Sequence, residues 1–568
     1  MRNYWASETM ARLRARFERL YGPAADRCLA RLAMLAGRYG IGEDAAPAGP
    51  PWSEKDAWLI TYADSIRAAG EKPLATLKRF LDRRLAGAIS TVHVLPFFPS
   101  SSDDGFSVIH YRTVDPALGD WPEVRALKER FHLAFDLVLN HVSRRSGWFL
   151  DYLAGVAPGR HFFIEADPAA DLSAVTRPRS TPLLHPARTR AGDRHVWTTF
   201  SEDQVDLDYS NPDVLFEILD ILLFYIAMGA RVIRLDAVAY LWKKPGTSCL
   251  HLPETHEIVR IMRDFLQLVS PQTILLTETN VPHDENVSYF GRGDEAHLVY
   301  QFSLPPLLLH ALWRGDATVL TRWASALADP PPGCAFLNFT ASHDGIGVRP
   351  LQGLVPDREV EWMEREVRGR GGQVSRRRNS DGSESAYELN ISWFSAMADP
   401  DPARHAARFL CSQAVLMALK GIPALYLHSL TSTPNDLDAV SRTGRARSIN
   451  RHAWNEAELA ARLDDPAAPA ARLFRELLAL LHCRAACPAF HPDAPQRVLD
   501  LGPELFALER TAADGGRVLA LHNCTGRTVD LALPPGNWTV LPGFAGRPPV
   551  DGRRLALRPY AFEWLVPA

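Results

Sequence analysis

Eight short apolar segments, separated by stretches with helical periodicity, constrain the fold of this chain more than any other feature. They lie at residues 58–62, 91–96, 133–139, 231–235, 273–277, 298–302, 335–340 and 422–427. Runs of this length predict buried strands, and strands that alternate with helices are typical of a parallel sheet. Because eight such units close into a (β/α)8 barrel, we expect a TIM barrel of the α/β class.

The length of the chain, 568 residues, leaves room for additions to this barrel. The predicted divisions are an N-terminal helical extension at 1–50, the barrel at 51–490 and a C-terminal β-sandwich at 491–568. The extension ends in a Pro- and Ala-rich linker at 45–51, which breaks the helical pattern. Two connections within the barrel are too long for simple loops, and they predict inserted loop domains at about 142–207 and 345–405.

Composition is that of an ordinary globular protein and gives no reason to expect nucleic acid or a membrane as partner. Hydrophobic residues make up 46% of the chain, charged residues 23%, and the formal net charge is −3. The first residues lack the apolar core of a signal peptide, and the apolar stretch at 214–230 is too short to cross a bilayer. The seven cysteines are scattered without zinc-site spacing, which favours reduced, buried thiols. We therefore expect a cytoplasmic protein.

Three acidic residues follow predicted strands directly. They are Asp236 after Arg-Val-Ile-Arg-Leu, Glu278 after Thr-Ile-Leu-Leu-Thr, and Asp344 in Ala-Ser-His-Asp. The C-terminal ends of barrel strands meet at one mouth, so these carboxylates are expected to converge there. Two working carboxylates with a third in support are what glycosyl transfer through an oxocarbenium-like transition state requires. The sequence therefore predicts a site for chemistry on a sugar.

The neighbours of these acids predict different roles for two of them. Arg234 stands two residues before Asp236, so both side chains are expected on the same side of the strand. A nearby guanidinium lowers the pKa of a carboxyl, and we expect it to keep Asp236 ionised, as a nucleophile must be. Glu278 has no cation beside it in the sequence, which favours a raised pKa and a role as proton donor.

Longer motifs around these residues resemble the α-amylase superfamily, glycoside hydrolase family 13, and in particular its sucrose phosphorylase branch. The matching segments, in order, are Ile-Thr-Tyr-Ala-Asp (60–64), Val-His-Val-Leu-Pro-Phe-Phe (92–98), Asp-Asp-Gly-Phe (103–106), Thr-Ser-Cys (247–249), Phe-Ser-Leu-Pro-Pro (302–306), His-Asp-Gly-Ile-Gly (343–347) and Ile-Asn-Arg (449–451). The resemblance runs from about residue 57 to 455. A set of long motifs in the family's order is a specific signal.

The resemblance implies a role for each matching residue. Asp236 matches the nucleophile, Glu278 the acid/base and Asp344 the stabiliser of the transition state, while Asp103 and Arg451 match the pair that holds the far hydroxyls of the glucosyl ring. The other positions that match the glucosyl site are Phe106, His141, Phe200, Gln204, Arg234 and His343. The implied reaction is a double displacement with retention, in which inorganic phosphate takes the glucosyl unit to give α-glucose 1-phosphate.

The segments that meet the acceptor depart from sucrose phosphorylases. Arg179 and Tyr387 match positions that bind phosphate, whereas Ser385 and Glu388 replace the residues that meet fructose. The segments that look most like glucosylglycerate phosphorylases of the same branch are 171–179, 196–200, 277–283 and the N-terminal extension. Glycerate carries a carboxylate, which a planar guanidinium suits, so the loop arginine Arg447 is a candidate for acceptor binding.

Other acceptors and reactions remain open on the sequence alone. The alternatives are a sucrose or sucrose-phosphate phosphorylase, a glucosylglycerol phosphorylase, a hydrolase or transglucosylase on the same fold, and a barrel that has lost its chemistry. No cofactor or metal is expected: amylases often bind calcium near the region of Asn140, sucrose phosphorylases generally do not, and no dedicated acidic loop is present. The sequence carries no signal on oligomeric state.

Overall fold

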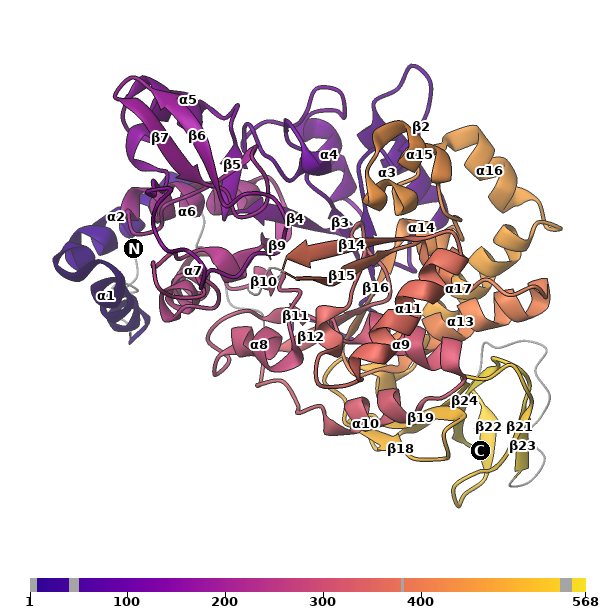
Figure 1. The fold of residues 1–568 in the computed structure, drawn as a ribbon. Coiled ribbons are helices and arrows are strands. Elements are labelled where there is room, and N and C mark those ends of the chain that lie inside the picture. The colour runs from indigo at the N-terminus through magenta and orange to yellow at the C-terminus, as the bar shows by residue number, and fades with distance from the viewer. Residues whose placement is uncertain (1–7, 40–50, 379–382, 542–553) are drawn as a thin grey trace.

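A closed barrel of eight parallel strands forms the centre of the computed structural model, which describes residues 8–39, 51–378, 383–541 and 554–568 (Figure 1). In barrel order the strands are β1 (Trp58–Thr61), β16 (Ile422–Tyr426), β12 (Ala335–Phe339), β11 (Leu298–Tyr300), β10 (Ile274–Thr277), β9 (Ala230–Asp236), β4 (His132–Val138) and β3 (Thr91–Val94). Each apolar segment predicted from the sequence contributes one strand, which confirms the (β/α)8 barrel. Residues 45–50 of the predicted linker lie outside the described residues.

Helices on the outer side of the barrel explain why its strands read as continuous apolar runs. Strands β1, β3 and β12 are buried at every position, as expected when a parallel sheet is covered on both faces. The helices of the barrel region are α3 (Pro73–Arg84), α4 (Trp121–Leu127), α6 (Pro212–Ala227), α7 (Pro253–Val269), α8 (His283–Val287), α9 (Leu304–Arg314), α10 (Thr318–Ala326), α13 (Pro402–Ala418), α14 (Leu427–Leu430), α15 (Leu437–Thr443), α16 (Glu456–Asp464) and α17 (Pro469–Ala485). Asn211 and Asp401 cap α6 and α13, each before a proline that favours the first helical turn.

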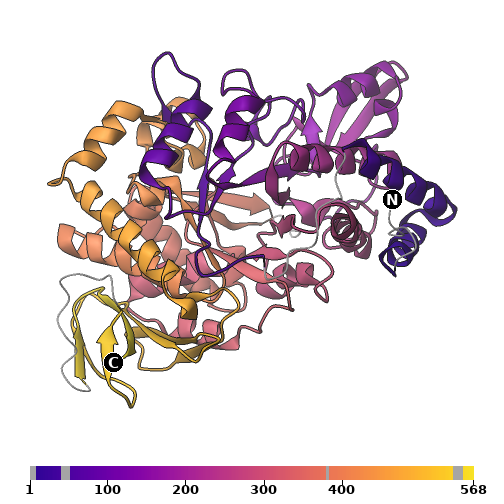
Figure 2. The same ribbon diagram turned by 180° about the vertical axis from the view of Figure 1, so that it is seen from behind.

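Two N-terminal helices, α1 (Glu8–Tyr21) and α2 (Ala25–Arg38), pack on the outside of the barrel against α7 and α6. Phe17 is buried and stacks on Phe216 of α6, with the ring centroids 5.9 Å apart. Arg16 is also buried, and its Nε lies 2.8 Å from Asp264 Oδ2 on α7. Figures 1 and 2 both show these helices at the end of the molecule opposite the C-terminal sheets.

Two inserted segments carry secondary structure of their own over the C-terminal ends of the barrel strands. The first holds β5 (His141–Ser143), α5 (Gly147–Ala154), β6 (Leu184–Thr189), β7 (Gly192–Trp197) and β8 (Gln204–Asp206). The second holds β13 (Ile346–Gly347), α11 (Asp357–Gly369), β14 (Gln373–Arg378), β15 (Glu384–Asn390) and α12 (Trp393–Ala396). Strands β13, β15 and β14 form a small antiparallel sheet, so the second insertion is an ordered structure that can position side chains.

The C-terminal region forms two sheets, as predicted for a β-sandwich. The larger has the order β18 (Gln496–Leu499), β19 (Leu505–Thr511), β20 (Arg517–Asn523), β24 (Phe562–Pro567) and β22 (Trp538–Val540), and the smaller pairs β21 (Val529–Ala532) with β23 (Arg554–Leu557). Leu505, Leu519, Trp538 and Leu557 from both sheets form one buried apolar cluster.

A buried arginine on α17 ties distant parts of the chain together at the base of the barrel. Arg484 donates hydrogen bonds to the backbone oxygens of Glu54, Asp56, Met417, Gly421 and Phe490. Met417 lies in the last turn of the outer helix α13, where unpaired carbonyls and the helix dipole favour a cation. The guanidinium therefore fixes the start of β1, the loop before β16 and the entry to the C-terminal sheets.

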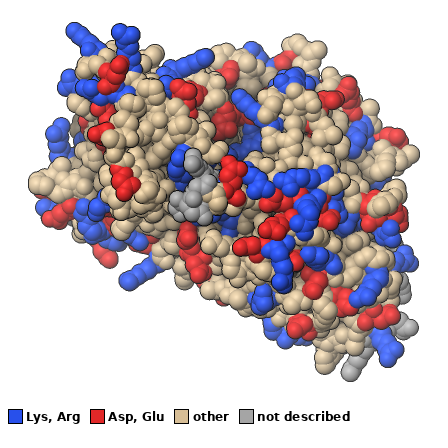
Figure 3. Space-filling model, in the orientation of Figure 1, with Lys and Arg blue, Asp and Glu red and all other residues tan. Residues whose placement is uncertain are grey.

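The surface of the molecule carries both signs of charge. On the face drawn in Figure 3, Lys and Arg are interspersed with Asp and Glu, in keeping with the net charge of −3. Across the described ranges, no helix combines the length and apolar character that crossing a membrane requires.

Candidate active site

A pocket at the C-terminal ends of the barrel strands brings together most of the residues predicted for the site. The predicted residues that line it are Asp103, Phe106, His141, Arg179, Phe200, Gln204, Asp236, Glu278, His343, Asp344, Tyr387, Glu388 and Arg447. The two others, Arg234 and Arg451, contact lining residues from behind: Arg234 binds Asp236, and Arg451 lies near Asp344. Residues more than three hundred positions apart in the sequence thus share one cavity.

Arg234 is the centre of a buried charge cluster beneath this pocket, and its side chain is only 3% exposed. Its Nη1 donates to Asp136 on the neighbouring strand and to Asp236 Oδ1 at 2.8 Å, while its Nη2 lies 4.0 Å from Glu278 Oε2. Asp136 is also bound by His93, whose Nε2 lies 2.7 Å from Oδ2. One guanidinium therefore faces three carboxylates that come from three adjacent strands or their ends.

The pKa of Asp236 responds to burial as well as to its neighbour Arg234. Burial raises the pKa of the Asp236 carboxyl, and the negative charge of Asp136 adds to this rise. Arg234 lowers the same pKa, in the direction predicted from the sequence, but the net shift is upward. The guanidinium is shared with Asp136 in a buried position, so its compensation of Asp236 is partial.

Glu278 has the environment predicted for a proton donor. Burial raises the pKa of its carboxyl to about 7, although Arg234 acts in the opposite direction. The backbone nitrogen of Ala237 donates to Glu278 Oε2 at 3.2 Å. Ala237 follows Asp236 directly and has a φ of 51°, a left-handed conformation that costs free energy for a residue with a Cβ. The strained residue thus links the two acids.

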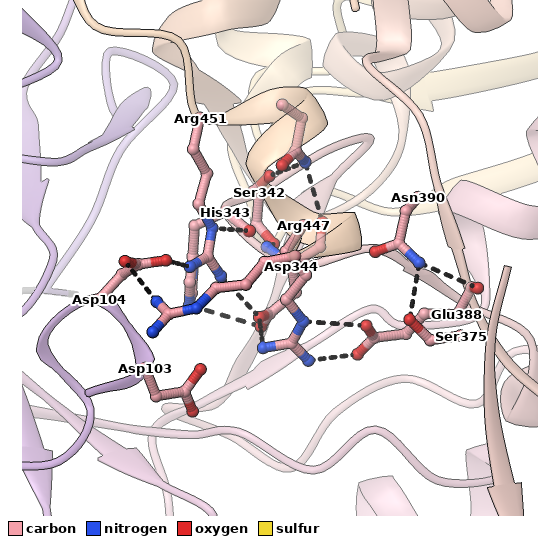
Figure 4. A network of polar contacts seen from close by, with 12 residues as sticks. Asp103, Asp104, Ser342, His343, Asp344, Ser375, Glu388, Asn390, Arg447 and Arg451 are labelled. Atoms are coloured by element: carbon pink, nitrogen blue, oxygen red, sulfur yellow. Dashed lines mark hydrogen bonds and ion pairs between the residues drawn. The ribbon is translucent and has the colours of Figure 1, made fainter. Parts of the chain in front are cut away.

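Two arginines hold Asp344 on the opposite side of the pocket (Figure 4). Arg447 Nη1 lies 2.6 Å from Asp344 Oδ1, and Arg451 Nη2 lies 3.7 Å from the same oxygen. Burial raises the pKa of Asp344, but Arg447, His343 and Arg451 together lower it below the ordinary value. Burial lowers the pKa of His343 to about 3, so the imidazole is neutral near pH 7 and the arginines provide the positive charge. Asp344 is therefore ionised.

Arg447 is already bound to carboxylates on two sides. Besides Asp344, it forms a two-pronged contact with Glu388 on β15, in which Arg447 Nε donates to Oε2 at 3.0 Å (Figure 4). A bidentate contact of this kind fixes both partners in orientation. Glu388 and Arg447 thus form part of the wall of the pocket, joining the second insertion to the loop after the last barrel strand.

Asp103 lies among polar partners on the other wall. Gln204 Nε2 donates to Asp103 Oδ2 at 3.2 Å and lies 3.1 Å from His141 Nε2. Phe106 stacks on His343 with 4.9 Å between ring centroids, so an aromatic face closes this wall. Arg451 pairs with Asp104, the neighbour of Asp103 (Figure 4).

A lysine ammonium occupies the centre of a buried oxygen cluster behind the pocket. Lys243 Nζ lies 2.6 Å from Asp206 Oδ2 and 2.7 Å from Asn140 Oδ1, and it also donates to the backbone oxygen of Tyr240. The lysine side chain is 3% exposed and that of Asp206 fully buried. A fixed positive charge therefore joins the end of β4, strand β8 and the loop after β9. Among the described residues, no group of three or more His, Cys, Asp or Glu side chains gathers in a way that could hold a metal ion.

Several residues of the site were not predicted from the sequence. Asp104 stands beside a predicted residue, and Asp136 interrupts the apolar run at 133–139, so both carried a weak local signal. Lys243 and Tyr240 carried no local signal in the sequence, because their partners lie on other strands and loops. The contact of Arg179 with the Tyr387 ring, at 5.7 Å from its centroid, likewise depends on two insertions that meet only in the fold.

Comparisons with known proteins identify the family. The sequence profile described as "Alpha amylase, catalytic domain" matches residues 87–322. A glucosylglycerate phosphorylase from Allomeiothermus silvanus is 45% identical over 96% of this chain and 97% of its own length, and one from Spirochaeta thermophila is 44% identical over 94% and 92%. The crystal structure of sucrose 6F-phosphate phosphorylase from Thermoanaerobacter thermosaccharolyticum is similar with a TM-score of 0.73 and 27% identity, covering 83% of this chain and 94% of that one.

The similarity to the two glucosylglycerate phosphorylases extends over 94–96% of the chain, and all three comparisons agree with the barrel and with the resemblance found in the sequence. The chain belongs to the α-amylase superfamily, glycoside hydrolase family 13, and within it to the phosphorylase branch that contains these relatives.

Replacing Lys243 with Met is expected to destabilise the protein, because it leaves the buried carboxylate of Asp206 without its cation. The cost of such an uncompensated charge is about 3–5 kcal/mol. The measurement is the unfolding midpoint in urea, with Lys244→Met as control, since Lys244 is the exposed neighbour. Equal midpoints for the two variants would show that the ammonium contributes nothing to stability.

Proposed function

We propose that this chain is a retaining glucoside phosphorylase that cleaves 2-O-α-glucosylglycerate with inorganic phosphate to give α-glucose 1-phosphate and glycerate. The observation that carries the proposal is one pocket in which Asp236 and Glu278 face the same guanidinium while Arg179 and Tyr387 lie at its rim. Two carboxyls so close together fit retention, which needs a nucleophile and a separate acid. The glucosylglycerate phosphorylases at 44–45% identity support the choice of substrate.

In the first half-reaction the Asp236 carboxylate attacks the anomeric carbon of the glucosyl unit. The bond from that carbon to O2 of glycerate breaks, and the proton of Glu278 passes to this oxygen. The pKa of about 7 keeps a large fraction of Glu278 protonated near neutral pH, as a general acid requires. Asp344, held ionised by Arg447 and Arg451, stabilises the positive charge that develops on the ring.

In the second half-reaction hydrogenphosphate replaces glycerate on the same face of the sugar. Its hydroxyl oxygen attacks the anomeric carbon, the ester bond to Asp236 breaks, and the phosphate proton passes to the Glu278 carboxylate. Arg179, whose guanidinium lies over the Tyr387 ring, supplies a cation for the phosphate. The buried walls around Asp236 restrict the access of water, the competing nucleophile.

Phosphate release from α-glucose 1-phosphate tests the proposed acceptor directly. Separate reactions of the purified protein contain D-glycerate, fructose, glycerol or no acceptor. We expect rapid release with D-glycerate and at least about tenfold slower release with the others, because a charge-assisted contact to the carboxylate is lost. Fastest release with fructose or glycerol would assign a sucrose-type or glucosylglycerol phosphorylase instead. Equal release without any acceptor would make the protein a hydrolase.

The protonated form of Glu278 predicts the pH dependence of the first half-reaction. The value of kcat/KM for the glucoside should fall as the pH rises through about 7, because Glu278 loses the proton that the leaving oxygen needs. With α-glucosyl fluoride, whose leaving group needs no proton, the same fall should be absent. The measurement is a pair of pH profiles on the same enzyme preparation. Parallel declines with both substrates would exclude Glu278 as the acid.

A further inference from the structure

Two arginines of the second insertion, Arg349 and Arg377, lie beside the strand that carries Tyr387 of the pocket and have no assigned role. Arg349 begins the short helix after β13 (Arg349–Leu351), and the residue before it, Val348, donates its backbone N–H to Tyr387 O at 3.1 Å. Arg377 lies on β14 opposite Ser385 on β15, and its Nε donates to Ser385 Oγ at 3.3 Å. Both are therefore placed next to the strand that carries Tyr387.

Both arginines belong to one cluster of positive charge that includes Arg179. Burial raises the pKa of Tyr240, but Arg349, Arg179 and Arg377 all lie close enough to this phenol to act against the rise. Tyr240 and Arg179 line the pocket, whereas Arg349 and Arg377 line a groove of the second insertion. The groove begins directly behind the pocket wall, because Gly347, two residues before Arg349, and Tyr387, two residues after Ser385, line the pocket. Arg349 and Arg377 also repel each other, and this repulsion lowers the pKa of Arg377 in addition to the larger effect of its burial.

Within the described part of the chain, Arg179, Arg349 and Arg377 form no ion pair with a carboxylate. Arg349 Nε is buried and has no hydrogen-bond partner there. Four acids line the same groove as Arg349 and Arg377, namely Asp357, Glu361, Glu364 and Glu384, and none of them forms an ion pair with either arginine in the described structure. The carboxylate of Glu364 is bound by Arg376 at 2.7 Å and Arg368 at 3.2 Å. Clustered, half-buried cations without carboxylate partners are the arrangement that binds an anionic ligand.

The other arginines near the pocket are already paired. Arg447 binds Asp344 and Glu388, and Arg445 binds Asp104 at 3.2 Å. A carboxylate arriving at Arg447 would have to compete with two acids of the protein, one of them buried. The unpaired cluster is therefore the better anchor for an acceptor, and Arg447 is better placed to hold the wall of the pocket.

We propose that Arg349 and Arg377, together with Arg179, form a single anion site that binds the glycerate carboxylate in one half-reaction and inorganic phosphate in the other. The inference rests on the proposed function. In a double displacement with retention, the leaving acceptor and the incoming phosphate use the same face of the anomeric carbon. Two anions that occupy this space in turn can share one set of cations. Arg349 and Arg377 thus select anionic over neutral acceptors.

Glucosyl transfer from α-glucosyl fluoride separates acceptor binding from donor binding, because this donor carries no phosphate or carboxylate. Fluoride release is followed with phosphate, D-glycerate, glycerol or no acceptor for wild type, Arg349→Ala and Arg377→Ala. We expect each variant to raise KM for both phosphate and D-glycerate by more than about tenfold, with glycerol and water rates changed less than about twofold. Arg376→Ala, the adjacent residue paired with Glu364, is the matched control and should behave as wild type.

The outcomes distinguish a failure of the shared anion site from a failure of the proposed function. Unchanged KM values for both anions in the variants, with a wild type that uses phosphate and glycerate, would overturn the shared anion site alone. A wild type that transfers to neither anion would overturn the proposed function. If Arg349→Ala does not fold, Arg349→Lys retains the charge but not the planar fork, and a smaller rise in both KM values would support the site. A rise for only one anion would refute sharing.

Discussion

The buried guanidinium of Arg234 is the interaction on which the rest of the site depends. It lies in a barrel interior from which water is excluded and faces Asp136, Asp236 and Glu278 at once. Without it, three carboxylates from adjacent strands would repel one another in a medium that screens charge poorly. Because one cation serves three acids, burial still raises the pKa of both Asp236 and Glu278. Arg234 thus offsets only part of the effect of burial on the two carboxyls. This partial offset suits a nucleophile and a proton donor that lie side by side.

The remaining charges of the pocket are paired around Asp344 and unpaired around Arg179. Around Asp344, the pairing of Arg447 with Glu388 and of Arg451 with Asp104 leaves few groups that can move without breaking an ion pair. Behind this wall, Lys243 fixes three further segments through their oxygens. Arg179, which lines the pocket, and Arg349 and Arg377 of the second insertion form no ion pair with a carboxylate among the described residues. A barrel of this kind changes acceptors by changing its loops, while the strand ends keep the chemistry.

The sequence predicted the barrel strands and the convergence of the acids because both depend on local pattern. A buried strand is a run of apolar residues, and Asp236, Glu278 and Asp344 each follow such a run. The sign of the pKa shift at Asp236 was not predictable, since it depends first on burial and then on Asp136, which lies opposite Arg234 on the neighbouring strand. The role of Lys243 was not predicted for a similar reason, because its partners Asp206 and Asn140 lie on elements far apart from it in the chain. Arg376 forms an ion pair with Glu364, whereas the adjacent Arg377 forms none with a described carboxylate. This difference depends on how the strand packs against helix α11 and cannot be read from the sequence.

The anomeric configuration of the phosphorylated product tests the proposed mechanism most directly. Phosphorolysis of 2-O-α-glucosylglycerate by the purified protein, followed by proton NMR, reports this configuration, which does not change by mutarotation because the anomeric oxygen carries the phosphoryl group. Double displacement through Asp236 predicts α-glucose 1-phosphate as the first product. Initial formation of β-glucose 1-phosphate would contradict the covalent role of Asp236, and free glucose in place of a sugar phosphate would contradict phosphorolysis itself.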